Sequence, residues 1–253
     1  MSRLSRTALV LAALPLAVML RWESPARPGN TDEPTETTRP ATAPRPRLVE
    51  RDAWHADEGL VREAPKYLPE VRAVFVHHTN HPADYDCADV PRMLRALESA
   101  HVRAKGWDDV GYQYVVDRCG TVYEGRGGGD AERTVRGAHT KGFNRTTVGI
   151  AALGDFSAGE PVPRAMLDAI AAVAAWKLPP DADPHGAVWL RSTNDESRFD
   201  ERSRARFPVI TGHRDAFETD CPGDALYAEL PLLRDEVARL RAQATAASAA
   251  STD

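Results

Sequence analysis

A histidine and a cysteine share one predicted loop late in the chain. His213 and Cys221 are eight positions apart, too far for one helical turn, and Pro222 with Gly223 stops any helix there. The segment 212–223 therefore folds back on itself and can wrap one metal ion. Imidazole and thiolate are the usual zinc ligands in proteins. The segment predicts two ligands of a zinc site.

A pair of histidines near the start of the predicted domain can supply a third ligand. The short apolar run 73–77 predicts a strand buried on both faces, and it ends in His77 and His78. Successive side chains of a strand point to opposite faces, so only one of the two can reach a given metal, and the pattern leaves open which. Three protein ligands are the count for a catalytic zinc that keeps its fourth position for water.

The cysteine count constrains the pairing. The chain has three cysteines, so one is left over after a disulfide forms in an oxidising compartment. Cys221 has His213 near it in sequence, whereas Cys87 and Cys119 have no histidine or cysteine at metal-ligand spacing. We therefore predict a Cys87–Cys119 disulfide with Cys221 as a zinc thiolate. The alternative is a free buried Cys221, which is less common among exported proteins.

The N-terminus has the layout of an export signal. Arg3 and Arg6 precede the apolar run 8–20, which is too short to span a bilayer comfortably. Residues 1–23 are predicted to be a signal peptide or, since no clean small-residue cleavage site follows, an uncleaved N-terminal anchor. We expect a secreted, extracellular protein, associated with the membrane or cell wall only through such an anchor.

The net charge of −5 over 253 residues restricts the partners. A protein of this sign gains nothing from the phosphates of nucleic acid, so we expect no nucleic-acid partner. Attraction to an anionic wall or membrane by charge alone is also excluded. We expect a monomer.

The chain divides into a linker, one domain and a tail. Residues 24–46 are rich in Pro, Thr, Arg and Glu and predict a disordered linker, and residues 244–253 predict a disordered tail. The domain, 47–243, alternates apolar runs with amphipathic stretches. Strands are predicted at 73–77, 112–117, 121–124, 147–153 and 208–211, helices at 90–105, 163–176 and 231–243, and an irregular loop at 179–206. This order predicts an α/β fold with a mixed central β-sheet and helices packed on its faces.

Six separated motifs resemble one enzyme family. The segments 74–79, 109–114, 122–126, 137–139, 142–144 and 212–223 are similar to those of the type 2 N-acetylmuramoyl-L-alanine amidases, which include the peptidoglycan recognition proteins and phage zinc amidases. The resemblance covers roughly 48–240 and keeps the family order. Cys119 in the predicted hairpin turn looks like the exported actinobacterial members. Gly127 and Gly128 stand where diaminopimelate-selective members have Gly-Trp, so the preferred stem peptide stays open.

The resemblance implies roles for the metal-proximal residues. It makes His77 a zinc ligand together with His213 and Cys221, and leaves His78 as a packing residue or a neighbour of the ligands. Tyr112 matches the catalytic tyrosine of the family. Thr219, two positions before the cysteine, matches a threonine of the active members, where a hydroxyl can donate to an oxyanion, although a turn-stabilising threonine is the alternative.

Three further residues are implied to contact substrate. His139 matches a substrate-side histidine of the family, and Arg126 and Asn144 lie in matching motifs. The reaction implied is zinc-dependent hydrolysis of the amide between N-acetylmuramic acid and L-alanine in peptidoglycan, so the muramic acid and its stem peptide are the partners. The alternative is a recognition protein that binds peptidoglycan without cutting it. A third possibility is a zinc-stabilised structural protein anchored at the wall.

Overall fold

The computed structural model describes residues 42–130 and 133–251, which belong to one unit, Thr38–Asp253. The predicted signal peptide or anchor, 1–23, and most of the predicted linker lie outside the described residues. No helix in the described ranges is long and apolar enough to cross a membrane.

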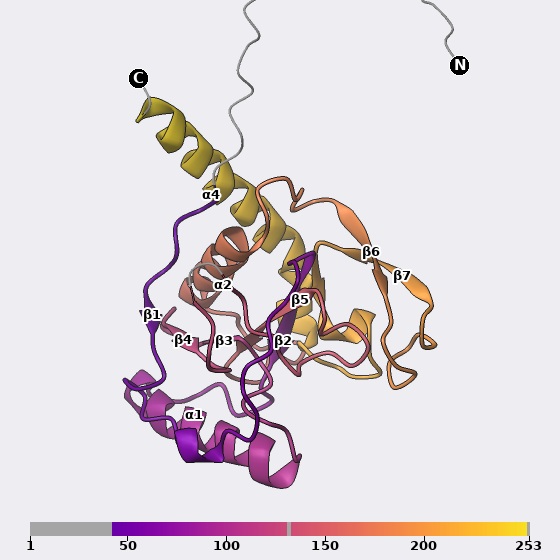
Figure 1. The fold of residues 1–253 in the computed structure, drawn as a ribbon. Coiled ribbons are helices and arrows are strands. Elements are labelled where there is room, and N and C mark those ends of the chain that lie inside the picture. Colours follow the sequence, from indigo (N-terminus) through magenta and orange to yellow (C-terminus); the bar gives the residue numbers. More distant parts are fainter. Residues whose placement is uncertain (1–41, 131–132, 252–253) are drawn as a thin grey trace, which may run out of the picture. The chain divides into compact units, whose positions relative to one another are not determined.

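A six-stranded mixed sheet forms the centre of the domain (Figure 1). Its strands are β1 (Leu48–Val49), β2 (Ala73–His78), β3 (Tyr114–Val116), β4 (Val122–Glu124), β5 (Thr147–Ala152) and β8 (Ile210–Gly212). The spatial order is β1-β4-β3-β5-β2-β8, and only the β3–β4 pair is antiparallel. Every residue of β2 and β5 is buried, as expected for parallel strands covered on both faces. The predicted mixed sheet is confirmed.

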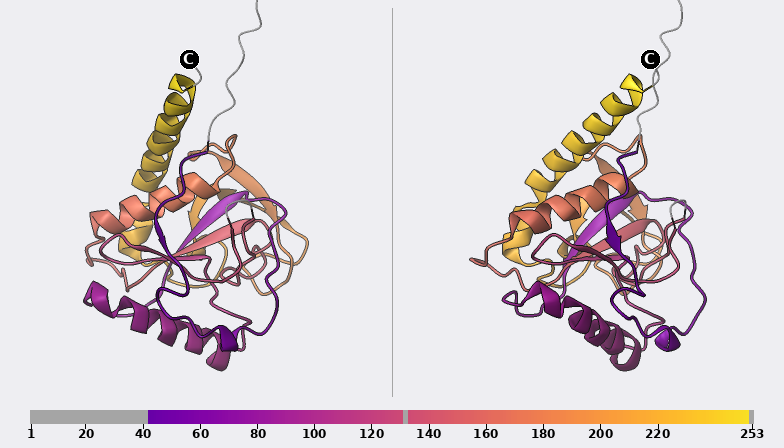
Figure 2. Two further views of the ribbon diagram at one scale, coloured as in Figure 1. Left: turned by 60° about the vertical axis from the view of Figure 1, so that its left-hand side comes forward. Right: turned by 90° about the vertical axis from the view of Figure 1, so that its left-hand side faces the viewer.

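Helices cover both faces of this sheet (Figure 2). They are α1 (Val90–Ser99), α2 (Arg164–Lys177), α3 (Asp224–Ala228) and α4 (Leu230–Ala250). Side chains alternate along each strand, so Val74 and Ile150 pack with α2 and α4, whereas Val115 and Ala151 pack with α1 on the opposite face. The alternation lets two apolar layers share one set of strands.

A second, two-stranded sheet corrects one prediction. Residues 179–206 were expected to be irregular, but β6 (Ala187–Arg191) and β7 (Arg204–Pro208) form an antiparallel hairpin. Leu190 and Phe207 point inward and pack with Phe75 of β2. Arg204 and Arg206 of β7 are exposed and alternate with buried residues. These arginines make the segment polar on average, which is why an amphipathic strand was predicted to be a surface loop.

Both predicted domain boundaries also need correction. The predicted linker ended at residue 46, yet Ala43 is buried in the core and the Arg45 guanidinium stacks on the Trp176 ring of α2 at 5.6 Å. The predicted disordered tail from residue 244 is wrong for the described residues, because α4 continues to Ala250. Alanine has the highest helix propensity, so an alanine-rich segment that follows a packed helix extends it.

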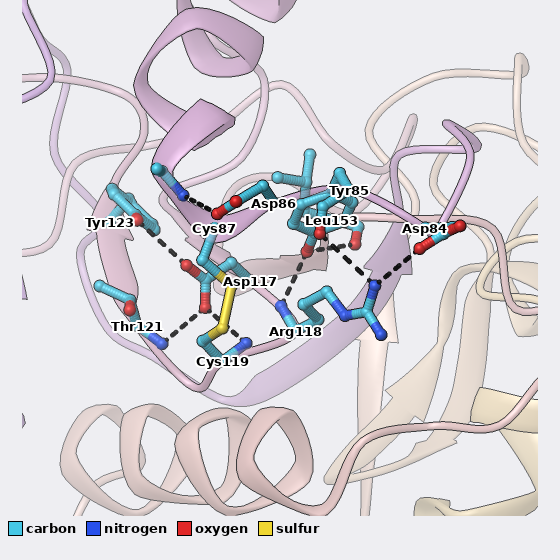
Figure 3. Close-up of a disulfide and its surroundings, with 11 residues drawn as sticks. Asp84, Tyr85, Asp86, Cys87, Asp117, Arg118, Cys119, Thr121, Tyr123 and Leu153 are labelled. Carbon is cyan, nitrogen blue, oxygen red and sulfur yellow. Dashed lines mark hydrogen bonds and ion pairs between the residues drawn. A yellow bond between two sulfur atoms is a disulfide. The ribbon is translucent and has the colours of Figure 1, made fainter.

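A disulfide joins the segment before α1 to the turn between β3 and β4 (Figure 3), as predicted. Cys87 and Cys119 are bonded with an S–S distance of 2.02 Å. The buried Asp117 carboxylate shapes this turn by accepting hydrogen bonds from the Cys119 and Thr121 backbone N–H groups, at 3.0 and 2.8 Å, and from the Tyr123 hydroxyl, at 3.0 Å. Cys221 remains the free cysteine, and it is buried.

Candidate active site

The parallel pairing of β2 and β8 brings two predicted ligands together. Val76 pairs with Gly212, so the residue after each, His77 and His213, lies at the same edge of the sheet. Their ring centroids are 4.5 Å apart. The Phe217 ring stacks on the His213 ring with the centroids 5.5 Å apart, which restricts the orientation of that imidazole.

The loop after β8 returns Cys221 to the two histidines. The Arg214 N–H donates to the Cys221 carbonyl at 2.9 Å, which closes the loop. The Asp215 carboxylate accepts from the Thr211 hydroxyl, from the Gly212 N–H and from the Tyr227 hydroxyl, so it braces the loop. The Cys221 Sγ lies 3.7 Å from His77 Nδ1. One donor atom from each of His77, His213 and Cys221 falls within 4.8 Å of the others.

His78 lies outside this three-residue group. Its side chain points to the opposite face of β2, where Nδ1 is 3.5 Å from the Asp155 carboxylate. Its backbone N–H donates to the Cys221 Sγ at 3.3 Å. The strand geometry therefore selects His77 as the histidine of the pair that faces Cys221, and His78 contributes through its main chain.

The protonation states of the group suit metal binding. Burial, together with the nearby His213, lowers the pKa of His77 well below its ordinary value, and burial lowers the pKa of His213 to about 4. Both imidazoles are therefore neutral at neutral pH and offer a lone pair. Burial raises the pKa of the Cys221 thiol to about 12 in the metal-free protein. A bound cation must displace this proton, as metals do when they bind thiols.

Tyr112 lies directly beside the group. Its ring centroid is 5.1 Å from that of His77, and burial, with a smaller contribution from Cys221, raises the pKa of its hydroxyl. The hydroxyl stays protonated and can act as a hydrogen-bond donor. The Gly111 N–H donates to His101 Nδ1 at 3.1 Å and the Arg126 N–H donates to the Tyr112 carbonyl at 2.8 Å, so the backbone that carries Tyr112 is held on both sides.

The Thr219 hydroxyl oxygen accepts a hydrogen bond from the Cys221 N–H at 3.2 Å. This contact is the turn-stabilising one that the sequence left as an alternative. It uses a lone pair of the hydroxyl, and the hydroxyl proton stays free to donate. The two interpretations of Thr219 are therefore compatible.

Arg126 and Asn144 line a cleft of about 310 Å³. The cleft is also lined by Lys66, Trp107, Asp108, Arg136 and Ala138, among others. The Arg126 Nε donates to the Val110 carbonyl at 2.8 Å, which fixes the guanidinium at the cleft wall. The Asn144 Oδ1 accepts from the N–H groups of His139 and Thr140, at 2.9 and 2.8 Å, so only its amide N–H groups remain available to a ligand.

His139 differs from its expected position. It was predicted to face substrate, but it is 5% exposed and its Nδ1 lies 3.0 Å from His77 Nε2. Thr140, which the sequence did not single out, places its hydroxyl 3.0 Å from the same His139 nitrogen. These two residues lie behind a predicted ligand. Their position depends on how the 137–144 segment packs against β5, and no sequence motif reports that packing.

The chain is similar in sequence to one known protein family and to several characterised proteins. A profile of the N-acetylmuramoyl-L-alanine amidase family matches residues 67–224. The pig and human N-acetylmuramoyl-L-alanine amidases are 33% and 34% identical to the chain over 184 and 186 residues, 72% of the chain in each case. Those matches cover 26% and 27% of the two relatives, so the chain spans about a quarter of their length. Peptidoglycan-recognition protein LB of Drosophila melanogaster is 29% identical over 73% of the chain and 67% of its own length.

Solved structures with the same fold include peptidoglycan recognition proteins. The wild-type Drosophila protein LB has a TM-score of 0.54 and 27% identity, and the match covers 73% of this chain and 92% of that one. Protein LE, solved in complex with tracheal cytotoxin, a monomeric diaminopimelic acid-type peptidoglycan, has a TM-score of 0.56 and 25% identity, with 72% and 91% covered.

Proposed function

Because the chain belongs to the N-acetylmuramoyl-L-alanine amidase family, we propose that it is a zinc-dependent hydrolase that cleaves the amide between N-acetylmuramic acid and L-alanine in peptidoglycan. The observation that carries this proposal is the complete group of His77, His213 and Cys221 beside the Tyr112 ring. A protein that only binds peptidoglycan has no need of three converging metal donors.

The three donors fit zinc. Two imidazoles and one thiolate form a borderline-soft set of the kind that zinc takes in catalytic sites, with one position left for water or substrate. Two ligands of one tetrahedral zinc, a nitrogen and a sulfur, stand about 3.6 Å apart. The His77 Nδ1 to Cys221 Sγ distance of 3.7 Å agrees with that spacing. When bound, zinc supplies Lewis acidity, which polarises a carbonyl and makes water a nucleophile at neutral pH.

Tyr112 and Thr219 supply hydrogen-bond donors next to the scissile amide. The raised pKa of Tyr112 keeps its hydroxyl proton in place, so the hydroxyl can donate to the oxyanion that develops on the carbonyl oxygen. Thr219 keeps its hydroxyl proton free while it accepts from the Cys221 N–H. Both donors are fixed before substrate arrives, so little reorganisation is needed in the transition state.

The cleft lined by Arg126 and Asn144 offers cationic groups to an anionic stem peptide. Arg126 and Arg136 line it and can pair with the carboxylates of such a peptide. Lys66 also lines it but pairs with Glu63 at 2.6 Å, and Glu63 and Asp108 are the acidic side chains of the lining. The structure of protein LE with tracheal cytotoxin supports a peptidoglycan fragment as the ligand of this fold. We therefore assign the cleft to the stem peptide and the His77 group to its junction with the sugar.

The other expectations remain proposals. A substrate in the cell wall and an export-type N-terminus in 1–23 support an extracellular location. A monomer is expected, and light scattering of the purified chain tests it. Fractionation of expressing cells tests the location, because an uncleaved anchor leaves the protein in the membrane fraction.

Product analysis tests the proposed reaction. Purified peptidoglycan is incubated with the protein, with the chelated protein, and with the chelated protein after zinc is restored. We expect new N-terminal L-alanine and no new reducing sugar ends, lost with the chelator and regained with zinc. New reducing ends would identify a glycosidase, and a free amine on another residue would identify an endopeptidase. Tight binding of an intact polymer would identify a recognition protein.

A further inference from the structure

The two ring nitrogens of His77 face different partners. Nδ1 is 3.7 Å from the Cys221 Sγ, on the side of the candidate metal. Nε2 is 3.0 Å from His139 Nδ1, on the side of the protein interior. A histidine that ligates a metal almost always donates its other N–H to an acceptor, which fixes the ring and its tautomer. The acceptor is usually a carboxylate or a carbonyl, and in this chain an imidazole nitrogen occupies that place.

The tautomer of His77 determines the tautomer of His139. If His77 binds a metal through Nδ1, its proton is on Nε2 and that N–H donates to His139 Nδ1. His139 then carries its own proton on Nε2, where the Thr147 carbonyl is 3.4 Å away. The Thr140 hydroxyl oxygen, 3.4 Å from His77 Nε2, is a second acceptor for the same N–H.

The fold holds His139 in this place from several sides. A Cβ added at Gly149 of β5 would lie 2.4 Å from the His139 ring, and one at Gly137 would lie 2.8 Å from it, so both positions leave room that only glycine provides. The Asn144 Oδ1 accepts from the main-chain N–H groups of His139 and Thr140 and anchors their backbone. A packed, hydrogen-bonded ring of this kind can impose an orientation on its neighbour.

We infer that His139, assisted by Thr140, is a positioning residue that fixes the ring and tautomer of His77 for metal binding. It acts through His77 and does not contact substrate, in contrast to the role that the family resemblance implied. The inference rests on the part of the proposed function that makes His77 a metal ligand. It makes the metal affinity of the free protein depend on a hydrogen-bond acceptor at the position of His139 Nδ1.

Three substitutions of His139 distinguish its proposed role as a hydrogen-bond acceptor for His77 from a role in packing alone. His139→Asn keeps an oxygen close to the position of Nδ1, whereas His139→Gln reaches toward the position of Nε2 and its Thr147 partner. His139→Leu removes both contacts and fills most of the space. If only packing matters, Asn should be the most damaging of the three, since it leaves the largest cavity.

The readout is metal binding by the full chain without substrate. Zinc affinity is measured by competition with a chromophoric chelator at one neutral pH, and cobalt is added separately to record its thiolate and ligand-field bands. We expect His139→Leu and His139→Gln to weaken zinc binding by about 10- to 100-fold and to shift the cobalt spectrum. We expect His139→Asn to stay close to the parent protein in both measurements.

Circular dichroism and thermal unfolding of the metal-free variants check that they fold. Thr140→Val, which keeps the shape and removes the second acceptor, provides an independent measurement if a His139 variant fails to fold, and it should weaken zinc binding by a smaller factor.

Unchanged zinc affinity in folded Leu and Gln variants, with a raised KM, would make His139 a substrate contact and overturn the inference. An affinity order that follows side-chain volume would also overturn it. A parent protein that binds zinc but cleaves nothing would defeat the proposed function and leave this inference standing.

Discussion

Replacement of Arg51 by methionine tests how the fold supports the segment that carries Tyr112. Arg51 is 6% exposed, and its guanidinium contacts the Glu98 carboxylate at 2.7 Å and the Asp109 carboxylate at 3.2 Å. Asp109 begins the segment that leads to Tyr112, and its carboxylate also accepts from the Gly127 N–H at 2.9 Å. Methionine retains much of the apolar stem of Arg51 and removes the charge.

The expected loss follows from the burial of Glu98. Its side chain is 0% exposed, and its second carboxylate oxygen accepts from the Asp57 N–H at 2.9 Å. Burial raises the pKa of Glu98 even with Arg51 beside it. The unfavourable desolvation of the carboxylate is therefore larger than its favourable interaction with the arginine. Removing one partner of such a buried pair costs about 3–5 kcal/mol of unfolding free energy, because an uncompensated charge stays inside.

The loss should depend on pH with a definite sign. A carboxyl whose pKa is higher in the folded state than its ordinary 4.5 binds its proton more tightly when folded. Stability therefore falls as pH rises from below that ordinary value through the folded-state pKa. Arg51→Met raises the folded-state pKa of Glu98 further. The deficit of the variant should be larger at neutral pH than near the ordinary pKa of a glutamate.

Urea denaturation at several pH values measures these free energies, with the slope m checked for constancy. The matched control is the double variant Arg51→Met with Glu98→Gln, which removes both charges and keeps an acceptor for the Asp57 N–H. It should recover at neutral pH the part of the loss that Glu98 causes, whereas the part caused by the buried Asp109 carboxylate, which also loses its arginine, should remain. A deficit below about 1 kcal/mol, the value of an exposed ion pair, would refute the reasoning. A loss of unfolding free energy that does not change with pH would also refute it, as would a double variant that is no more stable than Arg51→Met alone.

Three further results are expected. Tyr112→Phe should keep the bound metal and lower kcat by about 10²–10³, the usual effect of losing one oxyanion donor, and equal activity with full metal content would count against that role. Cys87→Ser combined with Cys119→Ser should lower the unfolding free energy by about 3–4 kcal/mol in urea, since the disulfide closes a loop of 32 positions, and an unchanged midpoint would contradict this. A chain that begins at Arg47 should fold but unfold at lower urea than one retaining Ala43, whose buried contact it lacks, and equal midpoints would show that this contact adds nothing.

The sequence identified the residues that strand geometry brings together. His77 ends a continuous apolar run and His213 follows another, and both runs became neighbouring parallel strands of one sheet. Their convergence follows from the rule that parallel strands share one carboxyl edge. The choice of His77 over His78 required the resemblance, because alternation along a strand excludes one of the two without naming it.

The contacts made by loops were less accessible to sequence reasoning. His139 sits in a recognisable motif, but its contact with His77, 62 positions away in the chain, depends on the space left by Gly149 of β5. The β6–β7 hairpin was missed because Arg204 and Arg206 alternate with apolar residues in a segment that is polar on average. Tertiary packing determines both the position of His139 and the formation of the β6–β7 hairpin, and the local sequence pattern carries little information about such packing.

The most direct test of the proposed function is a zinc titration of the metal-free protein, with amide hydrolysis of a soluble muropeptide followed at each step. Activity should rise in proportion to bound zinc and level off at about one zinc per chain, the content expected of one three-ligand site. Cys221→Ser should bind zinc more weakly and need correspondingly more of it for any activity, since a hydroxyl replaces the thiolate poorly. Full hydrolysis by the metal-free protein, or one tightly bound zinc with no hydrolysis at all, would contradict the proposed function.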